Sequence, residues 1–287
     1  MKRLVRGARP PELDGIKGGR PERDRARTHF VDEAKVDGFD FEAYSHRNVR
    51  QALAAMGAGK CAYCEAYYDA TQPQDVEHYR PKGRIDIDGG KIQPAYWWLA
   101  ADWDNLLPSC IHCNRLQNHV FPDGSELKSG KGERFPLDDE TARGRAEGGE
   151  GGEVPLLIDP CREDPVPYLR FVEEDERSIV KPAVEDPRQL AARRARASID
   201  IYGLNRPGLV NARSADLKRI KTSLLNVRFF AHALESAAPD EIATIEERFF
   251  DEVAFLRRHA SGETGFSAMA RPVIEPVFVS LGLTLTL

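Results

Sequence analysis

The sequence predicts an α+β protein that is mainly α-helical, with a small metal-held unit in its first half and a helical region in its second. Three observations favour this class: two Cys-x-x-Cys pairs, a stretch of alternating apolar and polar residues between them, and apolar residues at helical spacing near the end of the chain. With 287 residues, of which 41% are apolar, the chain can bury one large core or two smaller ones.

The first forty residues favour an extended arm rather than a folded element. Residues 1–40 are rich in proline, glycine and charge and show no apolar periodicity, so we expect an N-terminal arm that docks on another surface. The next segment predicts a helix, because its apolar residues fall near helical spacing. These are Tyr44, Val49, Leu53 and Met56. Gly57 and Gly59 end this helix just before the first cysteine pair.

The four paired cysteines predict a structural zinc site. The two pairs are Cys61 with Cys64 and Cys110 with Cys113. Between them lie 45 residues, from 65 to 109. Four thiolates complete the tetrahedral coordination of Zn²⁺, whereas a catalytic zinc keeps an open position. The pairs therefore indicate a zinc-stabilised domain, which we place at residues 41–137. Cys161 is left over, and we expect a reduced thiol in a reducing compartment.

Between the cysteine pairs we expect a β-hairpin, and the second pair starts a helix. Residues 75–95 alternate around RIDIDGGKIQP, where Gly89 and Gly90 are typical of a hairpin turn. The stretch CIHCNRLQN then places Asn114 and Asn118 one helical turn apart. These asparagines are either exposed polar residues or ligands for a hard metal ion.

The second half of the chain divides into a linker and a helical region. Residues 138–154 are charged and glycine-rich, which predicts a flexible linker or mobile loop. Residues 155–287 predict helices that fold around their own apolar faces, and Pro207 suits a first helical turn. Later apolar residues recur every three or four positions, as in an amphipathic helix. They are Ile242, Ile245, Phe249, Val253 and Leu256.

Charge and hydropathy limit the functions to consider. The formal net charge of −5 argues against a protein that binds nucleic acid by bulk electrostatics alone. The longest apolar stretch, VFVSLGLTLTL, is too short to span a bilayer. We therefore expect a cytoplasmic protein with no membrane partner.

A glutamate and a histidine stand side by side between the cysteine pairs, in DVEHYRPK. Neighbouring side chains of a strand point to opposite faces. Glu77 and His78 therefore face one site only if the chain bends, and Pro81 fits such a bend. Taken alone, His78 is either a satisfied structural residue or a catalytic base.

Three motifs together resemble the HNH endonucleases, the His-Me finger group with a ββα-metal site. They are VEHYRPK, DWDNLLPSC and CIHCNRLQN, and they stand in the family's order. Further motifs are similar to the PtuB nuclease subgroup of Septu-type antiphage systems, including members attached to retrons. These are KCAYCE, YWWLAADWDNLLPSCIHCN, LLIDPCREDP and IYGLN. The resemblance is close over residues 60–122 and looser over 155–205. It implies a zinc-clamped ββα-metal HNH core with flanking helices.

The resemblance assigns roles that the chemistry of phosphodiester hydrolysis also requires. His78 would be the general base, and Glu77 with Asn114 would hold a catalytic Mg²⁺ or Mn²⁺. Asn118 would be a further ligand or contact a phosphate. Asn105 would brace the loop that carries the base, although a turn residue explains it equally well. Glu77 stands where the family usually has aspartate, and Asn114 where many members have histidine. Neither departure removes a metal ligand.

Cationic and aromatic residues near these motifs each have two interpretations. The cationic side chains either contact phosphates or remain solvated charges. They are Arg80, Lys82, Arg84 and Arg115. The indoles either stack on bases or, as we expect, pack in the core. They are Trp97, Trp98 and Trp103.

Three hypotheses for function remain. The leading one is a metal-dependent HNH endonuclease that cleaves DNA as the effector of an antiphage complex, with an ABC-type or SMC-like ATPase of the PtuA type as the implied partner. An RNA-cleaving, toxin-like nuclease is the second, because nothing in the motifs recognises a 2′-hydroxyl. The third is a non-catalytic, zinc-held module that binds nucleic acid or protein. Such a module has no need for Glu77, His78 and Asn114 together.

Overall fold

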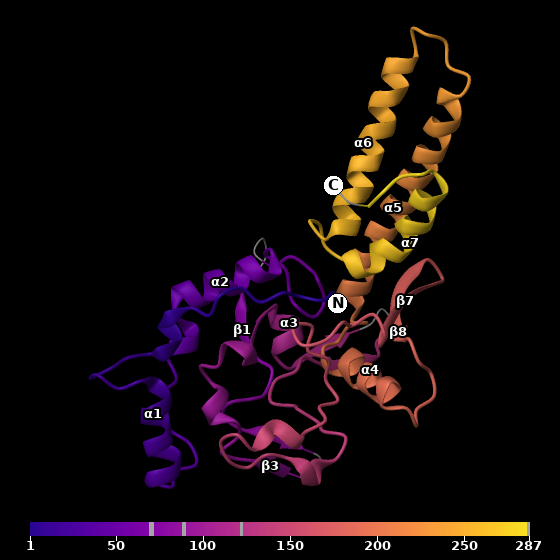
Figure 1. Cartoon of the computed structure of the whole chain (residues 1–287). Coiled ribbons are helices and arrows are strands. Elements are labelled where there is room, and N and C mark those ends of the chain that lie inside the picture. The colour runs from indigo at the N-terminus through magenta and orange to yellow at the C-terminus, as the bar shows by residue number, and fades with distance from the viewer. Residues whose placement is uncertain (69–71, 88–89, 121–122, 286–287) are drawn as a thin grey trace.

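Two long helices near the carboxyl end project from a body of short strands, turns and shorter helices (Figure 1). They are α5 (Pro207–Leu234) and α6 (Ile242–Ser261). The computed structural model describes residues 1–68, 72–87, 90–120 and 123–285. Within these residues, four two-stranded sheets accompany the helices, which confirms the α+β class.

The N-terminal segment runs along the chain's own body. It forms short turns and helices: η1 (Pro11–Asp14), α1 (Glu22–Arg27), η2 (Thr28–Asp32) and η3 (Ala43–Ser45). Arg6 donates hydrogen bonds to the backbone carbonyls of Trp103 at 2.6 Å and Leu106 at 2.7 Å. Trp103 donates its indole N–H to the carbonyl of Gly7 at 3.0 Å. The predicted arm therefore does dock, but on its own chain.

Helix α2 (Arg47–Gly57) leads the chain into the first cysteine pair. Val49 and Leu53 are buried on one of its faces, as the helical spacing predicted. The helix ends where Ala58 turns left-handed with a φ of 50° and Gly59 follows with a φ of 71°. Glycine adopts positive φ without strain, so Gly59 suits this turn. The helix therefore ends where the sequence predicted.

Two strands and a short helix position the segments around the second cysteine pair. Strand β1 (Asp75–His78) pairs antiparallel with β4 (Leu106–Ser109). Helix α3 (Ile111–Asn114) begins directly after Cys110. The histidine of β1 and the asparagine at the end of α3 therefore lie on adjoining elements.

Two further hairpins lie next to this unit. Strands β2 (Ile85–Ile87) and β3 (Gly90–Ile92) pair antiparallel, which confirms the hairpin predicted for this segment. Gly89, predicted to form its turn, lies outside the described residues. Strands β5 (Gln117–Val120) and β6 (Glu126–Ser129) form a hairpin that was not predicted.

The three indoles pack in the core, which confirms the favoured interpretation. Trp97, Trp98 and Trp103 are each no more than 5% exposed. They lie in the 3₁₀ turns η4 (Trp97–Leu99) and η5 (Trp103–Asn105). Trp98 donates its indole N–H to the carboxylate of Glu150 at 3.0 Å. With their rings buried, the indoles offer no free face for stacking on a base.

Residues 138–154, predicted as a flexible linker or mobile loop, form turns that contact the body of the chain. Their 3₁₀ turns are η6 (Glu140–Ala142) and η7 (Gly149–Gly152). The carboxylate of Glu153 is fully buried and accepts hydrogen bonds from Arg80 at 2.9 Å and Tyr96 at 2.6 Å. The composition of the segment offers little apolar burial, but this buried ion pair anchors it to the body.

The region predicted as helical, 155–287, also contains a β-hairpin. Strand β7 (Leu169–Glu174) pairs antiparallel with β8 (Arg177–Pro182). The turn residues Asp175 and Glu176 both have positive φ, at 49° and 61°. Such turns usually carry asparagine or glycine, and the absence of both left the hairpin without a turn signal.

The helices of this region follow the prediction. Pro207 is the first residue of α5, and α6 buries Val253 and Leu256 on its inner face. Helix α4 (Leu190–Ile201) precedes α5, and α7 (Ser267–Ser280) packs against both long helices. Among the described residues, no helix combines the length and the apolar composition needed to cross a membrane.

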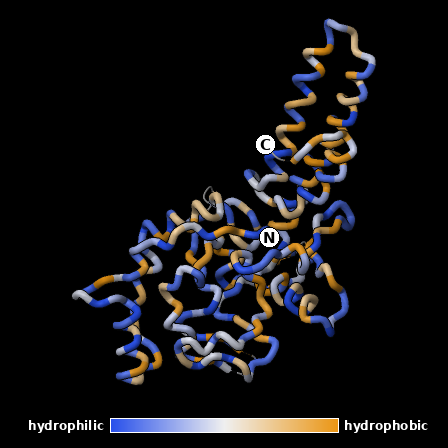
Figure 2. Tube along the Cα trace, viewed as in Figure 1, coloured by the Kyte–Doolittle hydropathy of each residue, from blue (hydrophilic) through white to orange (hydrophobic). Residues whose placement is uncertain are grey.

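One buried core joins the two halves of the chain. The paired cysteines and the apolar residues of α4 to α7 belong to the same cluster. Tyr63, beside the first cysteine pair, stacks on Tyr202 with ring centroids 3.7 Å apart. Figure 2 shows apolar positions distributed through the body and along the projecting helices. The predicted division at residues 138–154 therefore does not separate two cores.

Candidate metal centres and active-site cavity

The four paired cysteines form one buried cluster. Their Sγ atoms all lie within 4.8 Å of one another, and each side chain is shielded from solvent. The tight turn after α2 supplies two thiols, and the start of α3 supplies the other two. Four converging sulfurs suit tetrahedral Zn²⁺ and leave no open position for chemistry. The predicted cluster is confirmed, and it could hold a structural zinc.

A buried arginine from the C-terminal half covers this cluster. Arg206 donates to Cys113 Sγ at 3.4 Å and to Cys64 Sγ at 3.6 Å. Four thiolates around Zn²⁺ carry a net negative charge, so a guanidinium beside them offsets part of it. The sequence places Arg206 just before Pro207 and gives no sign of this role.

A second candidate centre is a cavity of about 450 Å³ at the end of β1. Its polar lining residues include Tyr44, Arg50, Asp75, Glu77, His78, Lys82, Arg84, Asn114, Arg115 and Glu133. The predicted Glu77, His78 and Asn114 thus meet at one cavity. Asn105, Asn118 and Arg80 are not among its lining residues.

His78 is held with one ring nitrogen committed and the other available. Its Nε2 lies 2.9 Å from the carbonyl oxygen of Ala100. A carbonyl only accepts hydrogen bonds, so Nε2 carries the proton and Nδ1 keeps its lone pair. Burial, and then the positive charge of Lys82, lower the pKa of His78 well below its ordinary value. The imidazole is therefore neutral at pH 7.

Glu77 is a buried carboxylate with a buried cationic partner. Lys131 Nζ lies 2.7 Å from Glu77 Oε1 and also donates to the backbone carbonyl of His78 at 2.8 Å. Burial raises the pKa of Glu77, and Lys131 opposes that shift. Lys131 was missed from the sequence. The available signal was its place between Gly130 and Gly132, whose φ values of 102° and 53° favour glycine.

Asn114 contacts a second acid that the sequence analysis missed. Its Nδ2 donates to Asp75 Oδ2 at 2.9 Å. Arg115 also binds Asp75, with Nε at 2.9 Å and Nη2 at 2.8 Å. The signal was strand alternation, because Asp75 stands two residues before Glu77 on β1 and shares its face.

The prediction that Asn118 lies one helical turn from Asn114 is wrong. Helix α3 ends at Asn114, and Arg115 is extended, with a ψ of 137°. The backbone amides of Lys131 and Gly132 bind the last helical carbonyls, those of Cys113 at 2.8 Å and Asn114 at 2.6 Å. With these carbonyls taken, the chain continues as β5, where Asn118 is exposed opposite Lys128. Asn118 therefore supplies no ligand at the cavity.

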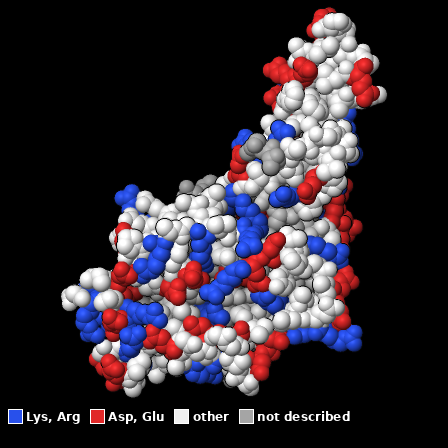
Figure 3. Space-filling view, in the orientation of Figure 1, with Lys and Arg blue, Asp and Glu red and all other residues white. Residues whose placement is uncertain are grey.

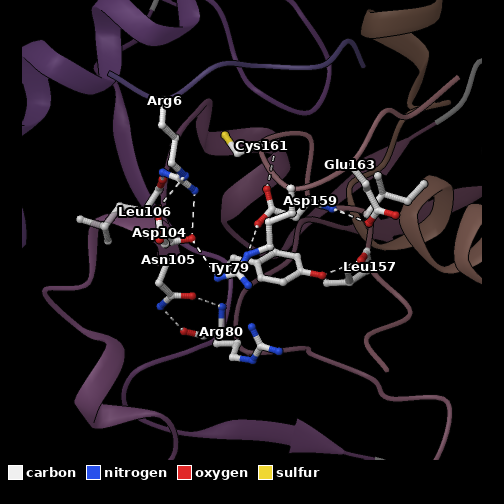
Figure 4. Close-up of polar contacts among 12 residues, drawn as sticks. Arg6, Tyr79, Arg80, Asp104, Asn105, Leu106, Leu157, Asp159, Cys161 and Glu163 are labelled. Atoms are coloured by element: carbon white, nitrogen blue, oxygen red, sulfur yellow. Dashed lines mark hydrogen bonds and ion pairs between the residues drawn. The ribbon is translucent and has the colours of Figure 1, made fainter. Parts of the chain in front are cut away.

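Asn105 holds the backbone just beyond the histidine. Its Oδ1 accepts the backbone N–H of Arg80 at 2.7 Å, and its Nδ2 donates to the carbonyl of Arg80 at 3.0 Å. Figure 4 shows this pair of bonds, with Arg6 gripping the neighbouring backbone and Tyr79 reaching Leu157. Asn105 also ends the turn η5, so both interpretations of this residue describe part of its geometry.

Of the four cations predicted either to contact phosphates or to remain solvated, Arg80 has neither environment in the structure. It is only 5% exposed and is paired with Glu153, so it offers no free charge at the surface. The remaining three line the cavity and are partly exposed, as is Arg50, which the sequence analysis missed. These three are Lys82, Arg84 and Arg115. Arg84 pairs with Glu133.

The cavity also has the donor chemistry for a hard divalent ion. Carboxylate and amide oxygens suit Mg²⁺ or Mn²⁺, and the cavity offers them from Glu77, Asp75 and Asn114. In the part of the chain that the structure describes, only the cysteine cluster brings three or more His, Cys, Asp or Glu ligand atoms together. An ion at the cavity would therefore have few protein ligands and keep most of its water.

Comparisons with known proteins find Septu proteins. Over 203 residues, 70% of this chain, it is 34% identical to "Septu protein PtuB" of Bacillus mycoides (strain KBAB4), and the alignment covers 60% of that protein. It is 29% identical over 158 residues, 54% of this chain, to "Septu protein PtuA" of the same strain, covering 19% of that protein. A PtuB of Bacillus thuringiensis is 37% identical over 67 residues, 23% of this chain and 22% of its own length. The chain thus spans less than two thirds of each relative. Neither a protein-family model nor a solved structure matches it.

Proposed function

We propose that this chain is a metal-dependent HNH endonuclease and the effector nuclease of a Septu-type antiphage system. Similarity to proteins named as Septu components supports the system. The observation that best supports the proposed nuclease activity is the cavity lined by Glu77, His78 and Asn114. A module that only binds nucleic acid or protein has no use for a buried acid beside a neutral imidazole.

In this proposal His78 is the general base. Its Nε2–H is committed to the carbonyl of Ala100, so Nδ1 is the atom that takes a proton from the attacking water. The Tyr44 ring packs against the imidazole in a T-shaped arrangement, with centroids 4.6 Å apart, and restricts its rotation. The lowered pKa keeps the base unprotonated at neutral pH.

Glu77 and Asn114 are the proposed ligands of a catalytic Mg²⁺ or Mn²⁺. When bound, such an ion neutralises the charge that develops on the leaving oxygen. Glu77 offers a carboxylate oxygen and Asn114 an amide oxygen. Lys131 holds Glu77 in place from the buried side, at 2.7 Å. Asn105 braces the backbone that follows His78, so that base and ligands keep a fixed separation.

The proposed substrate is a DNA phosphodiester. Lys82, Arg84 and Arg115 surround the cavity with partly exposed positive charge, which suits contacts with the phosphates on either side of the scissile bond. These residues bind backbone rather than bases, so we expect weak sequence preference from this chain alone. Cleavage of RNA in place of DNA would favour the toxin-like nuclease instead.

An ABC-type or SMC-like ATPase of the PtuA type is the proposed partner. The chain has a net charge of −5, and acidic side chains gather at the far end of the projecting helices on the face shown in Figure 3. Such a chain has little general attraction for a polyanion. A partner that grips the nucleic acid would supply that attraction, and the similarity to PtuA supports this choice.

The experiment that tests the proposal is plasmid cleavage by His78→Ala. Removing the base should lower strand cleavage by about 10²–10⁴-fold, because proton transfer from water is lost. Zinc content and the circular dichroism spectrum should stay unchanged, since His78 is not one of the four thiols of the cluster. The assay is run across a Mg²⁺ and Mn²⁺ titration, with and without the partner ATPase.

The matched control is His232→Ala, an exposed histidine on α5 far along the chain from the cavity. It should cleave at the rate of the unaltered chain. Full activity of His78→Ala would discard the HNH assignment and favour the non-catalytic binding module. Activity on RNA oligonucleotides but not on plasmid would retain the site and change the substrate.

A further inference from the structure

The orientation of the Asn114 amide decides whether this residue can bind a metal ion at all. An amide group has one oxygen that can serve as a ligand and one NH₂ group that cannot. The NH₂ group of Asn114 donates to Asp75 Oδ2 at 2.9 Å. An ionised carboxylate only accepts hydrogen bonds, so the nitrogen must face Asp75 and the oxygen must face away from it.

Asp75 is itself fixed in place. It lies on β1, two residues before Glu77 and on the same face of the strand. Its side chain is only 12% exposed, and Arg115 binds it through two N–H groups, at 2.9 Å and 2.8 Å. The carboxylate is thus held between Arg115 on the outside and Asn114 at the cavity.

We propose that Asp75 is a positioning residue of the metal site, which selects the amide orientation of Asn114 that presents Oδ1 as a ligand. The inference rests on the proposed function, because it concerns the same metal ion. Without Asp75, the amide can turn over and offer its NH₂ group to the cation. Groups that orient metal ligands in this way typically change metal affinity by about 10–100-fold when they are removed.

Asp75 could act in a second way, as a direct ligand, and one substitution separates the two roles. Asp75→Asn keeps an oxygen that accepts the hydrogen bond from Asn114, but it removes the negative charge that a metal ligand would contribute. The more exposed Arg115 can turn away from the new NH₂ group. A positioning role therefore survives Asp75→Asn, whereas a ligand role does not.

The test is Mn²⁺ binding to the intact, zinc-loaded chain without nucleic acid, measured by electron paramagnetic resonance and by calorimetry. Asp75→Ala and Asn114→Ala should each weaken Mn²⁺ binding by about 10–100-fold. Asp75→Asn should bind Mn²⁺ within about threefold of the unaltered chain, well short of that loss. Glu133→Ala is the matched control, because it removes one negative charge from the same cavity but the Glu133 carboxylate pairs with Arg84.

A double variant keeps the inference open to refutation even if Asp75→Ala is unstable. Asn114→Asp presents two equivalent oxygens, so it needs no orienting partner. Asp75→Ala should therefore weaken Mn²⁺ binding in the chain with Asn114 but not in the chain with Asn114→Asp. An equal loss in both backgrounds would overturn the positioning role.

The remaining outcomes separate this inference from the proposed function. If Asp75→Asn binds Mn²⁺ as weakly as Asp75→Ala, Asp75 is a ligand and the positioning role is overturned. If Asn114→Ala loses affinity while Asp75→Ala does not, the metal site stands and only the inference fails. If neither variant loses affinity, Asn114 is no ligand, and both the inference and the proposed metal site are wrong.

Discussion

Cys113 and Asn114 are neighbours on α3, yet one side chain joins the cysteine cluster and the other lines the cavity. The cluster is closed, and its four donors are identical thiols buried from solvent. The cavity is open, and its candidate donors differ in kind and depend on neighbours such as Lys131 and Asp75. Arg206 offsets the charge of the closed centre, but the centre's coordination is complete with its four thiols. An open one depends equally on residues that never need to touch it.

The largest effect should come from the closed centre. Cys110→Ser removes one of four ligands, so we expect loss of the bound zinc and of cooperative thermal unfolding, because structural zinc contributes directly to folding. Metal analysis and a melting curve followed by circular dichroism check this. Cys161→Ser is the control, since Cys161 lies outside the cluster, and it should retain one zinc. A Cys110→Ser chain that keeps its zinc would contradict the structural role.

At the open centre, the next largest effect should follow removal of a supporting cation. Lys131→Met leaves the Glu77 carboxylate buried without its partner, which should cost about 3–5 kcal/mol of the free energy of unfolding. Denaturation by urea measures the loss. The double variant Lys131→Met with Glu77→Gln removes the charge as well and should regain much of it. If the double variant is no more stable than Lys131→Met, the ion pair is not the cause.

A smaller effect on stability is expected at Asn105, which holds the backbone of Arg80 after His78. Asn105→Ala leaves the backbone N–H of Arg80 without its acceptor, which should cost about 1–3 kcal/mol. Because the loop after His78 loosens, cleavage should fall by up to about 10²-fold, while Mn²⁺ affinity stays unchanged. Asn226→Ala, which loses an amide contact with Glu252 on the projecting helices, should not affect cleavage. A parallel loss of Mn²⁺ affinity in Asn105→Ala would instead make Asn105 part of the metal site.

The smallest change is one of pH dependence. The pKa of His78 lies well below its usual value, first through burial and then through Lys82. The neutral, basic form of His78 therefore persists to lower pH than in an ordinary histidine. We expect kcat/KM to decline only below about pH 6.5, the ordinary pKa of histidine. Lys82→Met removes a positive neighbour, so the pKa should rise and the acid limb should move to higher pH. If the acid limb of the pH–rate profile of Lys82→Met stays in place, whatever the maximal rate, Lys82 does not lower the pKa of His78.

What the sequence could predict is the part that rests on local pattern. The cysteine spacing predicts the cluster, and the motifs bring Glu77, His78 and Asn114 to one cavity. The prediction for Asn118 was wrong because it assumed that the helix continues, whereas α3 ends at Asn114. Lys131 was not predicted because it is 53 residues from His78 in the chain, and no local pattern links the two.

The loop that carries Lys131 also fixes where the chain leaves the site and where it returns. A Cβ at Gly130 would lie 1.9 Å from the carbonyl oxygen of Arg115, so the two backbones are in direct contact. The segment between Arg115 and Gly130, which contains β5 and β6, is therefore a hairpin whose two ends are in contact. Ser129 at its returning end is buried, whereas Asp123 and Ser125 are exposed, so we expect changes at those two exposed residues to leave Asn114 and Lys131 in place. We therefore expect a reporter tag joined at these exposed residues to leave the cavity intact.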